Sequence, residues 1–318
     1  MSTLVRDVSH APLTHVVVCD RRANELASYI ATRRPDVVCR LRTGRLSDED
    51  RQWAGTVVGF RAAIDLGDSA VRWVHSTGAG VDGVLGEQWP REVVLTRTIG
   101  ALGHRIAEYC VGHALAFSQR VLAFHHNQTR GKWEPVEPTV VQNTRAVIIG
   151  TGSVGTAIGK RFHGLGCTPI GVSRQGHHRP PFKHVYPVTG LSVAVETAQW
   201  LVIAAPLTPH TRGVIGRAVL RRCRGAFVIN VARGGLLDTS ALLEGLKDGS
   251  ITGAALDVFE EEPLDRDSPV WAAPGVVITP HIAGVTHVDE AGDAFLEALG
   301  ALERGARPTT AVDPTRGY

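Results

Sequence analysis

Residues 146–155 read Ala-Val-Ile-Ile-Gly-Thr-Gly-Ser-Val-Gly. The β-branched run near their start predicts a buried parallel strand, and the segment 156–165 that follows predicts a helix. In the Gly-x-Gly-x-x-Gly spacing, Gly150 permits the tight turn, Gly152 lets the backbone approach a pyrophosphate, and Gly155 lets the helix pack close to the strand. Because a strand precedes this pattern and a helix follows it, we interpret it as a dinucleotide site with the pyrophosphate at the helix N-terminus. A glycine-rich turn in another kind of α/β protein is the alternative.

The composition is that of a folded globular protein with room for two domains. The chain has 318 residues, of which 43% are hydrophobic and 20% charged. Its formal net charge is only +3 and its basic residues are scattered, so charge gives no reason to expect nucleic-acid binding. The five cysteines show no Cys-x-x-Cys spacing, and no apolar run is long enough to span a membrane. We therefore expect a cytoplasmic protein with buried free thiols. The paired histidines, His125-His126 and His177-His178, lack ligand partners at metal-site spacing, so we expect no metal.

Strand-like and helix-like segments alternate along the chain. Before the glycine pattern, this alternation predicts a small parallel domain with strands at 15–19, 37–39, 57–59, 71–75 and 93–96. After it, further strands are expected at 168–172, 200–204, 226–231, 254–258 and 276–279. The predicted fold is α/β, with two doubly wound parallel-sheet domains: a Rossmann-type cofactor domain and a smaller flavodoxin-like domain.

Helical periodicity predicts how these domains are connected. Residues 101–124 have apolar residues at helical spacing and no proline, so we expect one long helix that leads from the first domain to the second. The polar segment 125–144 is interpreted as an excursion, and we hypothesise that it forms an intersubunit arm carrying Trp133.

Two further helices have recognisable ends. Asp238 is expected to cap a helix that stops at Gly249. A last helix, with Thr286 and Asp289 as its capping box, is expected to cover the first domain. The first domain would then be discontinuous, with 1–98 and 285–318 in it and 99–284 in the dinucleotide-binding domain.

The loop at 75–82 follows the fourth predicted strand and reads His-Ser-Thr-Gly-Ala-Gly-Val-Asp. Its glycines expose backbone N–H groups at the carboxyl end of a strand, an arrangement that suits a carboxylate. An ordinary glycine turn is the alternative.

The strand after the dinucleotide pattern ends in Ser173-Arg174. An NAD site is expected to carry an acidic residue here for the ribose hydroxyls, and that acid would repel a 2′-phosphate. Since the acid is absent, Ser173 and Arg174, with His177 or Arg179, are candidates to hold the phosphate. We therefore favour NADP over NAD, while an unpaired surface arginine is the alternative.

Three polar residues lie just beyond the carboxyl ends of three consecutive predicted strands: Arg233, Glu262 and His281. Ligands bind at this edge of an open α/β sheet. An arginine suits a carboxylate, a histidine exchanges a proton near neutral pH, and an adjacent carboxylate favours the imidazolium. Beside a hydride carrier, these groups indicate a 2-oxo acid reductase.

Over essentially its whole length, the sequence resembles the D-isomer-specific 2-hydroxyacid dehydrogenase family. Five motifs carry the resemblance: Gly150-Thr-Gly-Ser-Val-Gly155, Ala205-Pro-Leu-Thr208, Asn230-Val-Ala-Arg-Gly-Gly-Leu-Leu-Asp238, Ala255-Leu-Asp-Val-Phe-Glu-Glu-Glu-Pro-Leu264 and Thr279-Pro-His-Ile-Ala-Gly284. The resemblance implies that Arg233, Glu262 and His281 are the catalytic residues, with protonated His281 as the proton donor and Arg233 also on the substrate.

The resemblance also implies ligand contacts outside this trio. The first domain becomes the substrate domain, in which Thr77, Gly78 and Ala79 bind the substrate carboxylate. Asp257 is expected near the nicotinamide. The remaining residues that the resemblance places on the dinucleotide, apart from the three glycines and Ser173-Arg174, are Ser153, Val154, Ala205, Pro206, Val231, Ala232 and Gly284.

Within the family, Ser173-Arg174 and Ser268-Pro-Val-Trp271 look most like the glyoxylate/hydroxypyruvate reductase branch. This implies reduction of a small 2-oxo acid to the D-2-hydroxy acid with NADPH, by a homodimer that pairs through the helix near 101–124. Two alternatives stay open: a non-catalytic NAD(P)-binding sensor or corepressor on the same scaffold, and a dehydrogenase of another small acid such as formate or phosphite.

Overall fold

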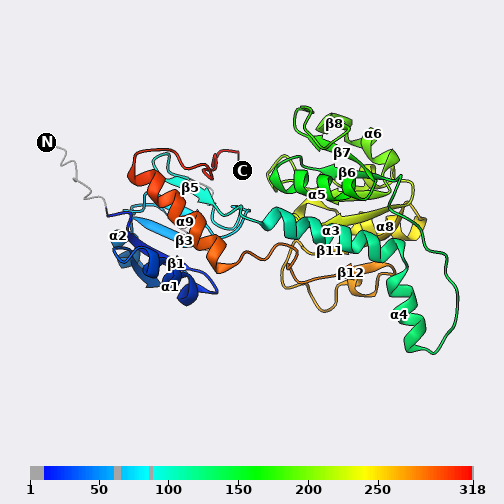
Figure 1. Ribbon diagram of the computed structural model, residues 1–318, viewed down its shortest axis with the longest axis horizontal. Helices are drawn as coiled ribbons and strands as arrows, with labels where there is room; N and C mark the ends of the chain where they lie inside the picture. Colours follow the sequence, from blue (N-terminus) through cyan, green and yellow to red (C-terminus); the bar gives the residue numbers. More distant parts are fainter. Residues whose placement is uncertain (1–10, 61–65, 86–88, 317–318) are drawn as a thin grey trace. The chain divides into compact units, whose positions relative to one another are not determined.

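The computed structural model describes residues 11–60, 66–85 and 89–316 of the chain (Figure 1). The sequence-based expectation that no apolar run spans a membrane also covered residues 1–10, which lie outside the described residues. The described chain forms two compact units, one ending at Ala101 and resuming at Thr286, the other spanning Leu102–Val285. Each unit contains one parallel sheet with helices between its strands, which confirms the predicted fold class. No helix in the described ranges is both long enough and apolar enough to cross a membrane.

The first unit has a five-stranded sheet in the order β2-β1-β3-β4-β5. All of its strand pairs are parallel. The strands are β1 (His15–Cys19), β2 (Val38–Leu41), β3 (Thr56–Gly59), β4 (Trp73–Ser76) and β5 (Val94–Arg97), each within two residues of its predicted range. This is the flavodoxin-like order, in which the chain reverses its direction of winding beside β1.

The described residues of the first unit form three α-helices: α1 (Ala23–Arg33), α2 (Asp48–Trp53) and α9 (Val288–Glu303). The C-terminal helix α9 packs on α1, and its Phe295 stacks on Trp73 of β4 at a ring distance of 4.8 Å (Figure 1). This packing recruits the end of the chain to the first sheet.

The predicted capping box of α9 is wrong by one residue. The helix begins after His287, and the Glu290 carboxylate accepts a hydrogen bond from the His287 backbone N–H at 3.2 Å. Thr286 remains in the preceding segment, where its carbonyl oxygen accepts from the Arg22 side chain. Asp289 instead bonds the N–H of its neighbour, Glu290, at 3.0 Å.

The second unit has a seven-stranded parallel sheet in the order β12-β11-β10-β9-β6-β7-β8. Its strands are β6 (Arg145–Ile149), β7 (Thr168–Ser173), β8 (His184–Pro187), β9 (Trp200–Ile203), β10 (Ala226–Asn230), β11 (Ile251–Leu256) and β12 (Val276–Ile278). The winding reverses at β6, the strand that leads into the glycine-rich turn. The predictions missed β8, a four-residue edge strand that ends in proline.

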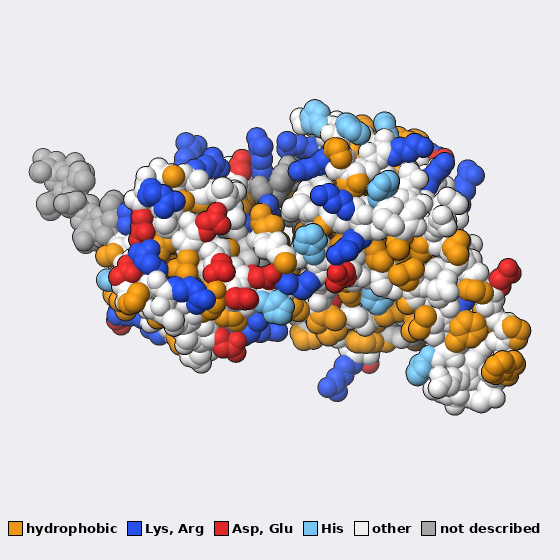
Figure 2. Space-filling view, in the orientation of Figure 1, with side chains coloured by type: hydrophobic (Ala, Val, Ile, Leu, Met, Phe, Trp, Pro, Cys, Tyr) orange, Lys and Arg blue, Asp and Glu red, His pale blue; other side chains and the backbone are white. Residues whose placement is uncertain are grey.

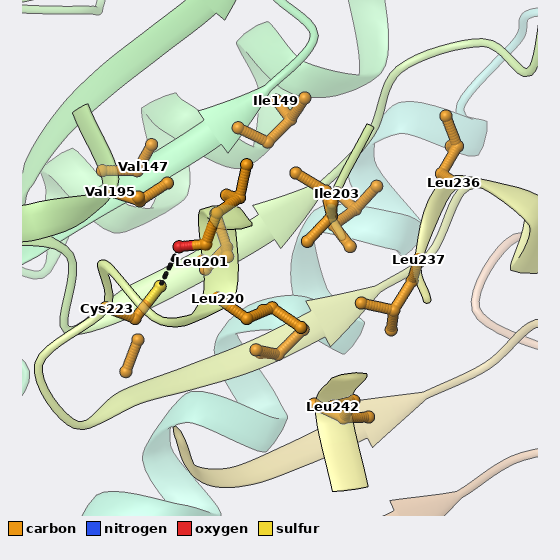
Figure 3. Close-up of a cluster of buried hydrophobic side chains, with 14 of the residues drawn as sticks. Val147, Ile149, Val195, Leu201, Ile203, Leu220, Cys223, Leu236, Leu237 and Leu242 are labelled. Atoms are coloured by element: carbon orange, nitrogen blue, oxygen red, sulfur yellow. Dashed lines mark hydrogen bonds between the residues drawn. The ribbon is translucent and has the colours of Figure 1, made fainter. Parts of the chain in front are cut away.

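Helices cover both faces of this sheet. The helices are α3 (Leu102–Ser118), α4 (Val121–Thr129), α5 (Ser153–Gly164), α6 (Leu191–Ala194), α7 (Arg217–Leu220) and α8 (Thr239–Asp248). On one face, Val147 and Ile149 of β6 join a cluster with Leu220 and Leu242 from α7 and α8 (Figure 3). The Cys223 thiol in this cluster donates to the Val219 carbonyl oxygen at 3.8 Å (Figure 3).

Helix α8 begins and ends as the sequence predicts. The Asp238 carboxylate accepts from the Ala241 backbone N–H at 3.0 Å, and Gly249 ends the helix with a φ of +80°.

The prediction of one helix over 101–124 is wrong. The helix α3 ends at Ser118, Arg120 has a left-handed φ of +57°, and α4 then begins at Val121. The returning chain closes the end of α3, because the Thr139 backbone N–H donates to the Ser118 carbonyl oxygen at 2.8 Å. Whereas α3 packs against α5, α4 has no buried residue. The apolar residues at helical spacing therefore continue beyond Ser118, although the last buried residue of these two helices is Ser118 itself. Both helices lie in the second unit, so α3 does not run from one unit into the other.

Candidate active site

The glycine-rich turn connects β6 directly to α5. Gly150 has a φ of +102°, and its backbone N–H donates to the Val172 carbonyl oxygen at 2.8 Å. A Cβ atom on Gly155 would lie 1.9 Å from the Gly150 carbonyl oxygen, so any side chain there would force helix and strand apart. A Cβ atom on Gly152 would meet nothing within 4 Å. Open space at this position leaves room for a pyrophosphate against the backbone.

The helix α5 begins at Ser153, three residues earlier than predicted. The N–H groups of Ser153, Val154 and Gly155 therefore lie in its first turn, where no helical carbonyl reaches them. These donors and the helix dipole together favour an anion beside the turn.

The loop after β7 carries positive charge next to this turn. Arg179 donates to the carbonyl oxygen of Thr151, a residue of the glycine-rich turn, at 3.1 Å. The Ser173 hydroxyl accepts from the Gly176 backbone N–H at 3.1 Å, and the His177 ring bonds the Gln175 side chain at 3.0 Å. Arg174 is exposed, and residues 173–179 contain no acidic side chain. The loop therefore fits a phosphate better than a pair of ribose hydroxyls.

The remaining residues expected on the dinucleotide follow β9, β10 and β12. Ala205 and Pro206 come after β9, Val231 and Ala232 after β10, and Gly284 after β12. A Cβ on Gly284 would lie about 3 Å from Ile106 and Leu102 of α3, so this loop packs directly on the helix.

The loop after β10 holds Arg233. The Asn230 side chain accepts from the Ala232 backbone N–H at 3.2 Å and donates to the Arg233 carbonyl oxygen at 3.1 Å. The Arg233 guanidinium itself donates to the Ala232 carbonyl oxygen at 2.7 Å. A Cβ on Gly234 would lie 1.9 Å from the Phe259 backbone, so only glycine lets this loop meet the one after β11.

His281 and Glu262 are in direct contact. His281 Nδ1 lies 2.9 Å from Glu262 Oε2, while Glu262 Oε1 accepts from the Phe259 backbone N–H at 3.1 Å. The side chains retain 25% and 19% exposure, so the pair is shielded but reachable. Because the carboxylate engages Nδ1, Nε2 is the ring nitrogen suited to exchange a proton with a ligand.

Asp257 lies beneath this pair and is almost fully buried. Its carboxylate accepts from the Thr279 hydroxyl at 2.6 Å and from the backbone N–H groups of Ile282 and Ala283 at 2.8 and 2.9 Å. It therefore holds the chain on both sides of His281. The sequence implied only that Asp257 lies near the nicotinamide; its bonds to the segment around His281 leave no signal in the sequence.

The loop expected to bind the substrate carboxylate lies in the first unit. Its Ser76 hydroxyl accepts from the Gly78 backbone N–H at 3.3 Å and donates to the Gly80 carbonyl oxygen at 2.8 Å. Thr77 donates to Asp20 at 2.7 Å, and Arg97 donates to the Ala79 carbonyl oxygen at 3.2 Å. Within the described part of the chain, the Ala79 N–H has no hydrogen-bond partner, whereas that of Gly78 is already engaged.

His75, at the start of this loop, is a second histidine near a proposed ligand-binding segment. It is fully buried, with its ring nitrogens 2.8 and 3.1 Å from the Thr96 and Thr98 hydroxyls. Burial lowers its pKa to about 3, so the ring stays neutral at physiological pH. His75 therefore stabilises the first sheet through its two hydrogen bonds and is unsuited to donate a proton. Among the described residues, no group of three His, Cys, Asp or Glu side chains is arranged to hold a metal ion.

Several known proteins are similar to this chain in sequence. Residues 111–283 match the family model described as D-isomer specific 2-hydroxyacid dehydrogenase, NAD binding domain. An uncharacterized protein of Streptomyces coelicolor, from the mprR 3′ region, is 36% identical over 82% of this chain and 95% of its own length. Glyoxylate/hydroxypyruvate reductase A of Yersinia enterocolitica is 31% identical over 78% of this chain and 82% of its own.

Solved structures give the same result. A D-isomer specific 2-hydroxyacid dehydrogenase from Xanthobacter autotrophicus, in complex with NADPH, is 28% identical with a TM-score of 0.85 over 96% of this chain and 99% of its own. An NADPH-dependent glyoxylate/hydroxypyruvate reductase from Sinorhizobium meliloti, in complex with NADP and sulfate, is 26% identical with a TM-score of 0.83 over 95% of this chain and 99% of its own.

Replacing each of three glycines in or near the glycine-rich turn by alanine should give three different results. Gly155→Ala should destabilise the second unit, because its Cβ meets the Gly150 carbonyl oxygen. Gly152→Ala should leave the melting temperature unchanged but weaken dinucleotide binding, because its Cβ fills the space left for the pyrophosphate. Gly164→Ala, in the same helix with open space around it, is the matched control and should stabilise the protein slightly.

Melting temperature and dinucleotide titration on the three variants check this. Equal binding by Gly152→Ala and the control would contradict the placement of the pyrophosphate.

Proposed function

Because the chain belongs to the D-isomer specific 2-hydroxyacid dehydrogenase family, we propose that it reduces a small 2-oxo acid, of the glyoxylate or hydroxypyruvate kind, to the D-2-hydroxy acid with NADPH. Membership makes it an NAD(P)-dependent oxidoreductase; the substrate and the roles of its residues are our proposal. The observation that carries the proposal is the His281–Glu262 pair, with Nδ1 and Oε2 2.9 Å apart at the edge of the sheet that also carries the dinucleotide turn.

The turn fits the dinucleotide that the family implies. Open space at Gly152 and the N–H groups of Ser153 and Val154 suit its pyrophosphate. A bound nicotinamide dinucleotide supplies the hydride. Arg174 and Arg179, in a loop without an acid, support NADPH over NADH, because a guanidinium pairs well with a 2′-phosphate. The relatives solved in complex with NADPH or NADP support the same choice.

The proposed acid chemistry follows from the trio. His281 donates a proton from Nε2 to the carbonyl oxygen as that oxygen gains negative charge. Glu262 stabilises the imidazolium and fixes the ring orientation through Nδ1. Arg233 binds the substrate carboxylate and polarises the carbonyl, an electrostatic contribution matched to the developing charge.

We also propose a carboxylate-binding role for a loop of the first unit. The loop of Thr77, Gly78 and Ala79 offers backbone N–H groups, of which that of Ala79 is unengaged within the described residues. Gly78 contributes once its N–H leaves the Ser76 hydroxyl, a bond that is long at 3.3 Å.

We further propose that the protein is a homodimer. Large apolar side chains are exposed on α4 and in the segment after it, and Figure 2 shows hydrophobic atoms gathered over α4. They are Val121, Leu122, Phe124, Trp133 and Val140, with Trp133 fully exposed. A cluster of this kind is typical of an interaction site. Sedimentation equilibrium should give twice the chain mass of 34.0 kDa, and a concentration-independent monomer would contradict the proposal.

The proposed reaction predicts turnover that depends on His281. The purified protein should oxidise NADPH faster than NADH with glyoxylate or hydroxypyruvate, and more slowly with branched or aromatic 2-oxo acids. His281→Ala should lower kcat by about 10²–10⁴-fold, the usual contribution of general acid catalysis, without changing the Kd for NADPH. His163→Ala, at an exposed position of α5, is the matched control and should retain wild-type turnover.

Three results would contradict this assignment. Near-normal turnover by His281→Ala would exclude it as the proton donor. Cofactor binding without turnover on any 2-oxo acid would favour a dinucleotide sensor, and turnover on formate or phosphite would identify a different small-acid dehydrogenase.

The loop after β7 predicts a change in cofactor preference. Arg174→Asp should weaken NADPH binding by about 10- to 100-fold, the value of one charge-assisted hydrogen bond, because the new carboxylate repels the 2′-phosphate. NADH binding should change much less. Arg145→Asp controls for the change in net charge, because Arg145 is exposed and begins β6, at the end of the strand away from the glycine-rich turn. Fluorescence titration of both cofactors measures this, and an equal loss of NADPH and NADH would contradict the phosphate assignment.

A further inference from the structure

A chain of three hydrogen-bonded side chains runs from α3 to the loop that carries His281. The Tyr109 hydroxyl lies 2.7 Å from the Thr279 hydroxyl, which lies 2.6 Å from Asp257 Oδ1. None of the three belongs to the trio proposed to act on the substrate. Tyr109 is half-buried, and its ring packs against His113 at 4.3 Å, so its position is set by the helix and not by solvent.

The direction of each hydrogen bond follows from its neighbours. The Asp257 carboxylate already accepts from the backbone N–H groups of Ile282 and Ala283, so Thr279 must donate its only hydroxyl proton to it. The Thr279 oxygen is then left to accept, and Tyr109 must be the donor. Burial raises the pKa of Tyr109, so its hydroxyl keeps this proton at neutral pH.

These bonds lie on both sides of His281. Thr279 precedes the histidine by two residues, and Ile282 and Ala283 follow it directly. The Asp257 carbonyl oxygen also accepts from the His281 backbone N–H at 2.9 Å. His281 itself has a φ of +56°, a left-handed conformation that residues with side chains rarely adopt.

We propose that Tyr109 and Thr279 are positioning residues for the proton donor. Through Asp257 they hold the loop in the conformation that places the His281 ring against Glu262. Without them, Asp257 Oδ1 would keep only the Ile282 N–H as a donor, and the left-handed turn would relax toward ordinary backbone conformations. The inference rests on the proposed function, because it assumes that His281 donates the proton.

Three variants separate the hydrogen bonds from simple packing. Tyr109→Phe keeps the ring and its contact with His113 but removes the donor. Thr279→Val keeps the shape of the side chain but leaves both Tyr109 and Asp257 without this partner. Thr279→Ser restores the hydroxyl. Tyr29→Phe is the matched control, because it removes a tyrosine–carboxylate hydrogen bond of 2.7 Å, to Asp293 on the exposed surface of the first unit.

The experiment measures kcat, KM and amide hydrogen exchange on the wild type and these four variants. We expect Tyr109→Phe to lower kcat by about 3- to 10-fold, the value of one neutral hydrogen bond. Thr279→Val should lower it by about 10- to 100-fold, because this change removes one hydrogen bond from the half-buried Tyr109 hydroxyl and another from the buried Asp257 carboxylate. KM for NADPH and for the 2-oxo acid should stay within about two-fold, since these residues do not bind ligand. Thr279→Ser and Tyr29→Phe should keep wild-type kcat.

Hydrogen exchange on the ligand-free protein gives a readout independent of turnover. The amides of Ile282 and Ala283 should lose protection in Tyr109→Phe and more so in Thr279→Val, with protection elsewhere in the second unit unchanged. Wild-type protection at these amides in Thr279→Val would overturn the inference, as would a loss of activity that appears only in KM. A wild type that turns over no 2-oxo acid would overturn the proposed function, and the exchange data would still decide whether the three side chains hold the loop.

Discussion

The contact between His281 and Glu262 depends on three loops meeting at one edge of a parallel sheet. Because β10, β11 and β12 are neighbours and run in the same direction, the segments after them must leave the sheet side by side. Two local features let them approach closely. Gly234 has no Cβ to collide with the Phe259 backbone, and the buried Asp257 carboxylate ties down the segment around the histidine. The orientation of the imidazole is therefore a consequence of backbone packing below it.

The same edge explains why a dinucleotide site and an acid–base pair occur in one unit. The winding of the sheet reverses at β6, where the glycine-rich turn begins, and open α/β sheets bind their ligands at such a reversal. Backbone donors at the start of α5 favour an anion there, and the arginine-bearing loop after β7 adds charge beside it. Groups suited to phosphates follow β6 and β7. Groups suited to binding a carboxylate and exchanging a proton follow β10, β11 and β12, farther along the same sheet.

Most of this edge could be predicted from the sequence, because parallel strands that are buried on both faces appear as short β-branched runs. Arg233, Glu262 and His281 were recognisable as candidates since each follows such a run. Other features leave no local signal. The break after Ser118 arises because burial ends there while apolar spacing continues, and β8 contains only one β-branched residue, Val185, so no apolar run marks it. Tyr109 and Thr279 are 170 residues apart in the chain, so no spacing rule could pair them.

We propose that this chain transfers a hydride to the C2 carbon of a 2-oxo acid and that the product is the D-2-hydroxy acid. The most direct measurement uses NADPH doubly deuterated at C4 with glyoxylate or hydroxypyruvate, followed by mass spectrometry and chiral analysis of the product. We predict one deuterium at C2, and the D configuration for hydroxypyruvate. A product without deuterium at C2, or one of L configuration, would contradict this proposal.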